Sequence, residues 1–331
     1  MMVFRLDTKV FRACIPICTN GIHSVCALPS GDVLCGGGDG TLKVVSGSDM
    51  SWRMAHNTTL GKASIMALSL SANQTELIVG ASNGTVYRCL AANLSSSVVS
   101  VGICNAITVI AFGSHKSGPS TDDGDSKHSI YFATGSPSSD IKIWDITDYA
   151  CVATAKFPKS GAVQSLCLID SSKYLLSGWE DGYIRCCDTA TLTQTMWYLH
   201  NAHKDGVRSL SAYVDQSIGY FASGGGDGAV RVWRLGSREC VAQYSEHTKG
   251  VVKVAVDINL PNIIHSIGTD GTVLAFDLKT AKRRMCHMVT SGVMADFSQR
   301  RDSENELVTC DNQGRLLYWD IDVRLVSTRV Q

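Results

Sequence analysis

This sequence lacks long apolar runs and an excess of charge of either sign. No stretch of about 18 apolar residues occurs, and the start, MMVFRLDTKVFRAC, has no continuous apolar segment of the kind a signal peptide needs. The 30 Lys and Arg residues balance the 30 Asp and Glu residues, so no long-range field attracts nucleic acid or an anionic membrane. We therefore expect a soluble intracellular protein that binds neither nucleic acid nor membrane.

The sequence also has few prolines and no pair of cysteines with the spacing of a metal site. The chain has 6 prolines and 18% charged residues but 30 glycines, a combination that suits many short strands joined by tight turns. Its 13 cysteines lack the paired spacing of a zinc site, since Cys14 and Cys18 are four apart and Cys186 and Cys187 are adjacent. Most cysteines stand in apolar runs, where a free thiol packs as a small hydrophobe. We expect no metal and no cofactor.

The chain does contain a repeat. In each copy a β-rich run leads into a turn that ends in Asp-Gly or its equivalent, and alternating apolar residues follow, with an anchor five places past the Gly. The best copy is ASGGGDGAVRVWRL, with Gly228 and Trp233. The Gly position is filled in the other copies by Gly40, Gly84, Ser139, Gly182, Gly271 and Gly314. With Gly228 in its place between Gly182 and Gly271, the seven positions follow at successive intervals of 44, 55, 43, 46, 43 and 43 residues. A period of roughly 40–45 with a W-D signature is typical of a four-stranded propeller blade.

Seven copies predict an all-β fold, a WD40-type β-propeller of seven four-stranded repeats that occupies residues 1–331. The repeats are expected at approximately 20–60, 61–102, 103–158, 159–203, 204–247, 248–290 and 291–331. The single interval of 55 comes from a polar, Gly/Ser/Asp-rich insertion at 113–129. It is interpreted as a flexible surface loop, with a partner contact as the alternative.

Several residues look catalytic but are better explained by blade architecture. His203, Ser223, Asp227 and Trp233 have the spacing of the hydrogen-bonded network that orders a WD blade. His247, Ser266 and Asp270 repeat it in the next copy, where Phe276 replaces the Trp. A Ser–His–Asp nucleophile would be activated at one serine, not repeated between blades. The glycine runs at 36–38 and 224–226 precede strands, whereas a phosphate-binding loop precedes a helix. We predict no catalytic residue, no small-molecule substrate and no enzymatic activity.

Trp179 departs from the repeat. It lies in SGWEDG, where the other copies have small residues, and is predicted to project from one rim of the propeller as a candidate partner contact. The alternative is that its indole packs against a loop of the adjacent blade.

Three stretches carry a family resemblance. SGWEDGYIR (177–185), NAHKDGVRSL (201–210) and SGGGDGAVRVW (223–233) occur in this order at close spacing, and SIGTDGTVLAFDL (266–278) and LLYWDI (316–321) follow. Together they resemble the second half of the cilia- and flagella-associated protein 52 family. That resemblance implies two seven-bladed propellers in tandem, placed in the lumen of axonemal doublet microtubules with tubulin and other lumenal proteins as partners.

The resemblance leaves two arrangements open. The seven repeats either close into one ring, or they form two blades plus a five-blade arc of a longer tandem propeller. The terminal segments VFRACIPI and VRLVSTRV are both strand-like, so pairing between the two ends of the chain could close a ring.

The predicted function follows from the repeat and the resemblance together. We expect a non-catalytic scaffold, a structural microtubule inner protein that stabilises ciliary or flagellar doublets, located in the cytoskeleton of the axoneme. The alternative is a general cytosolic WD-repeat adaptor, such as a ubiquitin-ligase receptor or a signalling scaffold.

Overall fold

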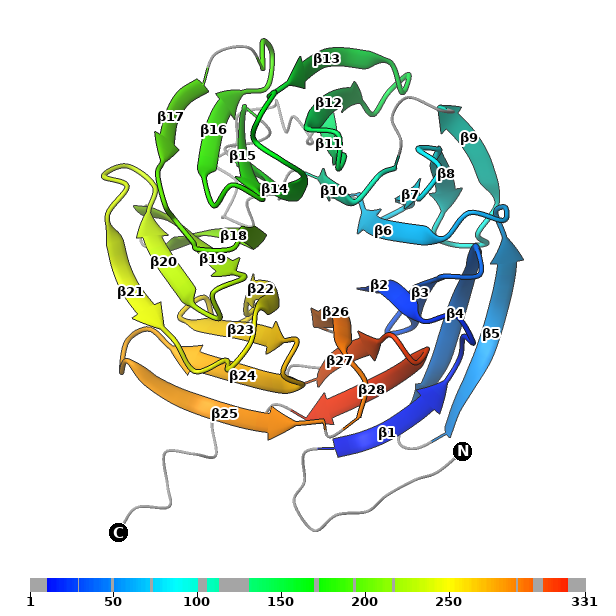
Figure 1. The fold of residues 1–331 in the computed structure, drawn as a ribbon. Coiled ribbons are helices and arrows are strands. Elements are labelled where there is room, and N and C mark those ends of the chain that lie inside the picture. Colours follow the sequence, from blue (N-terminus) through cyan, green and yellow to red (C-terminus); the bar gives the residue numbers. More distant parts are fainter. Residues whose placement is uncertain are drawn as a thin grey trace, which may run out of the picture. The chain divides into compact units, whose positions relative to one another are not determined.

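The structure is a computed structural model in which seven four-stranded antiparallel sheets account for all the strands of the described residues (Figure 1). It describes residues 11–28, 30–48, 51–71, 74–100, 106–112, 131–169, 173–192, 195–215, 218–289, 291–299 and 306–320. By their contacts these residues fall into two compact units, Met1–Met66 with Ser211–Gln331, and Ala67–Leu210. The insertion predicted at 113–129 lies outside the described residues.

Four sheets, or blades, lie wholly or mostly in the first unit. In chain order they are β2–β5, β18–β21, β22–β25 and a blade of order β1-β28-β27-β26. The strands are β1 (Phe11–Pro16), β2 (Ile22–Ala27), β3 (Val33–Gly37), β4 (Thr41–Ser48), β5 (Ser51–Thr59), β18 (Val207–Asp215), β19 (Ile218–Gly225), β20 (Val230–Arg234), β21 (Cys240–Tyr244), β22 (Val251–Val256), β23 (Ile263–Gly268), β24 (Thr272–Asp277), β25 (Lys282–Met288), β26 (Met294–Gln299), β27 (Glu306–Asp311) and β28 (Arg315–Asp320).

Three blades, β6–β9, β10–β13 and β14–β17, lie wholly or mostly in the second unit. Their strands are β6 (Ile65–Leu70), β7 (Glu76–Ala81), β8 (Val86–Leu90), β9 (Ser96–Ser100), β10 (Val109–Phe112), β11 (Tyr131–Gly135), β12 (Asp140–Asp145), β13 (Cys151–Lys156), β14 (Val163–Ile169), β15 (Tyr174–Trp179), β16 (Ile184–Asp188) and β17 (Thr195–Leu199). Among the described residues, none forms a helix that is long and apolar enough to cross a membrane.

Burial follows the order of strands within a blade. The second strand is the most apolar and the most buried, and all six residues of β23 and of β27 are buried. The fourth strand faces solvent, since β17 and β21 both alternate exposed with half-buried residues. The middle strands of the blades are therefore buried and the outer strands exposed, as the alternating patterns of the sequence predict.

The predicted turns are present. Gly228 has φ +77°, and a Cβ at this position would lie 2.6 Å from the carbonyl oxygen of His247, so both the turn conformation and the close approach favour glycine. Ser139, which replaces the glycine in the third copy, has φ +65°, and its hydroxyl donates a hydrogen bond of 2.6 Å to the Gly161 carbonyl. That bond offsets part of the strain of a left-handed serine.

The N-terminal strand completes the last blade. β1 pairs antiparallel with β28, with Cys14 opposite Leu317 and Ile15 opposite Leu316, and the two strands lie side by side in Figure 1. The VFRACIPI segment thus forms a strand as predicted, but its partner is β28, and VRLVSTRV lies outside the described residues. The last repeat contributes three strands of its own, and the fourth comes from the start of the chain.

The last blade also packs against the first. The Asp296 carboxylate on β26 accepts hydrogen bonds from the Ser24 hydroxyl (3.0 Å) and the Val25 amide (2.9 Å) of β2, and Lys253 of β22 reaches the same carboxylate at 2.5 Å. One carboxylate thus links three successive blades of this unit. A separate five-blade arc would leave β2 and β26 apart, so that alternative is wrong here, and the fold is a seven-bladed WD40 β-propeller.

Candidate functional site

The blade network predicted around Trp233 is partly formed within the first unit. The indole N–H of Trp233 donates to the Ser223 hydroxyl at 2.8 Å, and Asp227 accepts the Ala229 amide (3.2 Å) and pairs with Arg231 (2.8 Å). His203 is buried, and its contact with this blade stays a prediction. The other indoles at the anchor position make the equivalent bond, Trp144 to Thr134 at 2.9 Å and Trp319 to Thr309 at 3.0 Å.

The next copy of the network is complete except for the tryptophan. His247 lies 2.8 Å from the Ser266 hydroxyl through Nε2, and 2.6 Å from Thr272 and 3.4 Å from Asp270 through Nδ1. Burial lowers the pKa of His247 despite the nearby carboxylates of Asp270 and Glu246, so the neutral imidazole is favoured. For Asp270, burial raises the pKa, but hydrogen bonds from Thr272 and Thr248 outweigh that effect and lower it to about 2. The trio is a buried structural network with Ser266 fully enclosed, not an accessible nucleophile.

Trp179 does not project from a rim, and the prediction of an exposed partner contact is wrong in this structure. It is the last residue of β15 and is 0% exposed. Its ring packs edge-on against Phe157, from the loop that follows β13 in the preceding blade, at 5.0 Å between centroids. This is the packing alternative, and burying so large an apolar surface is the physical reason for it.

The indole of Trp179 also takes over a missing hydrogen bond. In this blade Cys187 stands at the anchor position, and its thiol has no indole N–H to offer. Trp179 donates from its own N–H to the Ser177 hydroxyl at 2.9 Å, from two residues away on the same strand. The blade therefore keeps the tryptophan–serine bond although the tryptophan has moved from the third strand to the second.

A different aromatic group is exposed on this blade. Tyr198 of β17 is 52% exposed, and its ring packs edge-on against His200 at 4.5 Å and lies 6.4 Å from that of Tyr183. Nearby, the Arg185 guanidinium lies over the rings of Tyr183 and Trp179 and pairs with Asp181 at 2.7 Å. The sequence TMWYL of β17 could have predicted this exposure, because successive side chains of a strand face opposite sides of the sheet.

A buried His–Asp pair also escapes detection from the sequence. His265 Nε2 lies 2.8 Å from the Asp257 carboxylate, which also accepts the Gln299 side-chain amide at 3.0 Å. Burial raises the pKa of Asp257, but hydrogen bonds from His265 and from the Leu260 and Asn259 amides lower it overall. Both side chains are almost fully enclosed, at 1% and 2% exposed, so the pair braces β22, β23 and β26 and offers no access to a substrate.

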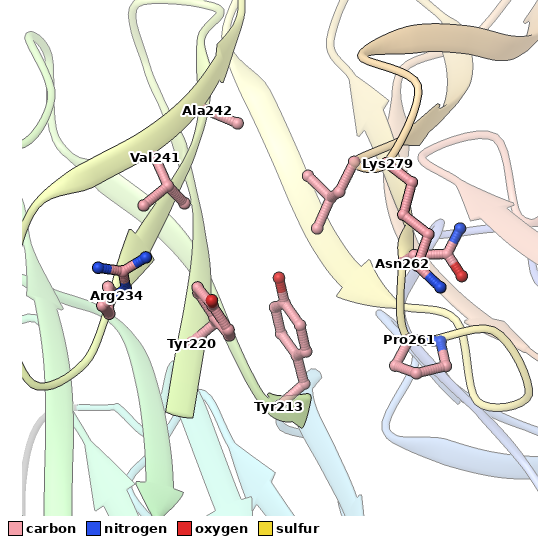
Figure 2. A pocket seen from close by; sticks show the side chains of 9 residues that line it. Tyr213, Tyr220, Arg234, Val241, Ala242, Pro261, Asn262 and Lys279 are labelled. Atoms are coloured by element: carbon pink, nitrogen blue, oxygen red, sulfur yellow. The ribbon is translucent and has the colours of Figure 1, made fainter. Parts of the chain in front are cut away.

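A groove lies between the blades β18–β21 and β22–β25, with a volume of about 240 Å³ (Figure 2). It was not predicted, because its walls come from turns of two repeats and none of its residues is a repeat anchor. It is lined by Tyr213, Tyr220, Arg234, Val241, Ala242, Pro261, Asn262, Leu278 and Lys279.

Within the described part of the chain, no group of three or more His, Cys, Asp or Glu side chains is placed to hold a metal ion. Several cysteines are buried among apolar residues, and burial raises the pKa of Cys89 and of Cys186 to about 12. These thiols pack as neutral apolar groups.

Comparison with known proteins agrees with the repeat and with the resemblance. The family model "WD domain, G-beta repeat" matches residues 9–46 and 194–234. The chain is similar to cilia- and flagella-associated protein 52 of Chlamydomonas reinhardtii (27% identical over 306 residues), Homo sapiens (23% over 305) and Bos taurus (23% over 305). These alignments cover 91% of this chain, so the predicted resemblance is confirmed, and it extends beyond the motifs that revealed it.

The chain spans 45% or 46% of the length of these relatives. Among solved structures, the crystal structure of the WD40 beta propeller domain of Doa1 superposes with a TM-score of 0.76 at 15% identity. That match covers 94% of this chain and 96% of that one. At this identity the match concerns the fold alone.

Proposed function

We propose that this WD40 propeller is a non-catalytic, protein-binding scaffold of cilia or flagella, a structural component of the axonemal doublet that binds tubulin and other lumenal proteins. The observation that carries the proposal is its similarity, over 91% of its length, to cilia- and flagella-associated protein 52 from an alga and from mammals. A family found in both a green alga and mammals, under a name that refers to cilia and flagella, favours a role in the organelle that they share.

The chemistry of the described residues supports a scaffold role. The His–Ser–Asp trio of β22–β25 and the His265–Asp257 pair are enclosed and serve as braces between strands. Such groups stabilise a rigid frame through the buried hydrogen bonds that they form, although the Nδ1 atom of His265 is buried without a partner among the described residues. Function then belongs to the exposed outer strands and to the turns between blades.

The test is fractionation of ciliated cells that express the tagged chain. We expect it to pellet with demembranated axonemes and to form chemical cross-links to tubulin. The WD40 propeller domain of Doa1 with the same tag is the matched control, because it shares the fold at 15% identity. A purely cytosolic distribution would overturn the proposal, and recovery of ubiquitin-ligase or kinase subunits without tubulin would support the general adaptor instead.

A further inference from the structure

The groove between blades β18–β21 and β22–β25 lies at the end of the sheets opposite the Asp-Gly turns. Tyr213 lies near the end of β18 and Tyr220 near the start of β19, Arg234 ends β20, Val241 is the second residue of β21, and Leu278 and Lys279 follow β24. Successive turns of an antiparallel sheet alternate between its two ends. The groove residues therefore share one end of the two blades, opposite the end at which His247 contacts Asp270.

The floor of the groove is apolar and aromatic. The rings of Tyr213 and Tyr220 stack at 5.4 Å with an interplanar angle of 18°, and Val241, which is 45% exposed, lies above them on the outer strand. Figure 2 shows the Tyr213 hydroxyl pointing into the space between Val241 and Lys279. The stacked tyrosines and their exposed aliphatic neighbour can pack against one apolar side chain of a ligand. The tyrosine hydroxyl at the edge can hydrogen-bond to the ligand's main chain or to a carboxylate.

The rim of the groove is cationic. Arg234 and Lys279 are the charged residues of the lining, and no carboxylate is among them. The nearest ion pair of Arg234, with Glu239, spans 3.9 Å between two exposed side chains and is weak in water. Within the described residues no carboxylate lies within ion-pair distance of the Lys279 ammonium, and both charges are therefore available to a ligand.

The neighbouring carboxylate does not cancel these charges. Asp277 is held by Arg284 at 2.5 Å and accepts the Asn262 amide at 3.1 Å. Burial raises its pKa, but the hydrogen bonds from Arg284 and Asn262 outweigh burial and hold that pKa far below its usual range. Because the Arg284 guanidinium neutralises this carboxylate, the local field at the rim stays positive.

We infer that this groove binds an acidic peptide segment of a partner protein, with one apolar side chain on the Tyr213–Tyr220 floor and flanking carboxylates on Arg234 and Lys279. Charge complementarity identifies the occupant, since two available cations border an apolar floor of single-side-chain size. Single-stranded nucleic acid fits less well. The rings of Tyr213 and Tyr220 stack on each other, so one face of each ring is closed to a base, and two cations are too few to line a phosphate backbone. The inference rests on the proposed scaffold role but not on its place in the cilium.

The experiment begins with selection of a random dodecapeptide phage library on the purified chain. We expect the selected peptides to share one Phe, Leu or Trp flanked by Asp or Glu. A synthetic fluorescent copy of the best peptide then gives affinities by fluorescence anisotropy. The double variant Arg234→Glu, Lys279→Glu should bind it at least about tenfold more weakly, since each exposed cation becomes a repelling carboxylate. Val241→Asp should weaken binding as well.

The control is Lys249→Glu, which replaces one exposed cation by a carboxylate at the opposite end of blade β22–β25. It should change the affinity by less than about twofold, and all variants should keep the wild-type melting curve because the altered side chains are exposed. Selected peptides without acidic residues, an affinity unchanged by the double reversal, or displacement by an oligothymidine at similar concentration would overturn the inference. If the chain pellets with axonemes but fails this peptide test, the proposed function stands and only the groove inference is overturned. If the chain binds the peptide but is cytosolic, only the ciliary role is overturned.

Discussion

At the residue scale, some side-chain roles can be predicted from position in the repeat, and others depend on contacts between repeats. Ser223 and Trp233 could be assigned from the sequence because their hydrogen bond depends on a spacing that recurs in other blades. Trp179 could not, because a residue between a strand and a turn can face either solvent or the next blade. What decides its direction is Phe157 of the preceding blade, a contact between repeats that no local pattern contains.

If Trp179 serves the blade, its substitution should reduce stability. Trp179→Phe keeps a ring but removes the N–H that Ser177 accepts, so a double-mutant cycle with Ser177→Ala should give a coupling energy of about 1 kcal/mol in urea unfolding. A Trp179→Phe variant of wild-type stability that loses a binding partner would instead restore the partner-contact hypothesis.

The buried His247 should make stability depend on pH. Its folded pKa lies below the ordinary value of 6.5, so the unfolded chain binds the proton more readily, and the free energy of unfolding should fall as the pH drops below about 6.5. Asp270, with a pKa of about 2, stays ionised throughout that window. His247→Gln should therefore show a smaller loss between about pH 7.5 and pH 5.5 in urea titrations.

His200→Gln, at an exposed position, is the control for this measurement. Equal pH dependence in wild type and His247→Gln would show that His23 and His287, whose pKa values are also lowered by burial, carry the effect.

At the scale of elements, the strands and turns of the repeats follow from local sequence, whereas the assembly of the last blade does not. Alternating apolar residues and Asp-Gly turns specify β18–β21 or β22–β25 within one repeat. The partner of β1 lies at the far end of the described chain, and a strand-like pattern alone does not choose between β28 and the segment after it. The groove was missed for a related reason, since two repeats build it together.

The β1–β28 pairing can be tested with a disulfide. Cys14 lies directly opposite Leu317, and both contact the same apolar cluster, so their side chains share a face of the sheet. Opposed residues of antiparallel strands have Cα atoms about 4.5–5.5 Å apart, within the range of a disulfide. Leu317→Cys should therefore form a bond with Cys14 on mild oxidation, detected as a cross-linked peptide by mass spectrometry.

The oxidised Leu317→Cys variant should unfold at higher denaturant than its reduced form, by about 2–4 kcal/mol. The same variant with Cys14→Ser should give no such peptide and no such difference. Absence of the cross-link in Leu317→Cys itself would contradict the pairing.

At the scale of the whole molecule, the balance of charges limits how the protein can associate with partners. With zero formal net charge there is no long-range attraction, and binding must come from local contacts such as the groove and the exposed outer strands. Composition alone could predict this property, but only the structure shows where two cations remain available.

Association with axonemes should therefore resist salt. Raising the salt from about 0.15 M to about 1 M shortens the Debye length from about 8 Å to about 3 Å, yet the pelleted fraction should change by less than about twofold on immunoblots. Binding of the acidic peptide to the groove should weaken over the same range, because it depends on charge. Release of the whole chain at high salt would mean that charge contacts dominate.

The last blade combines β1 with β26–β28, and this constrains the order in which the protein can fold. During translation β1 leaves the ribosome before any other described strand, but β28, its partner in the ladder, leaves last. Until then the nascent chain carries an unpaired strand edge, which is prone to pair with other chains. Contacts of such long sequence separation form slowly, so we expect biogenesis of this propeller to depend on chaperones that shield β1 until β28 has been synthesised.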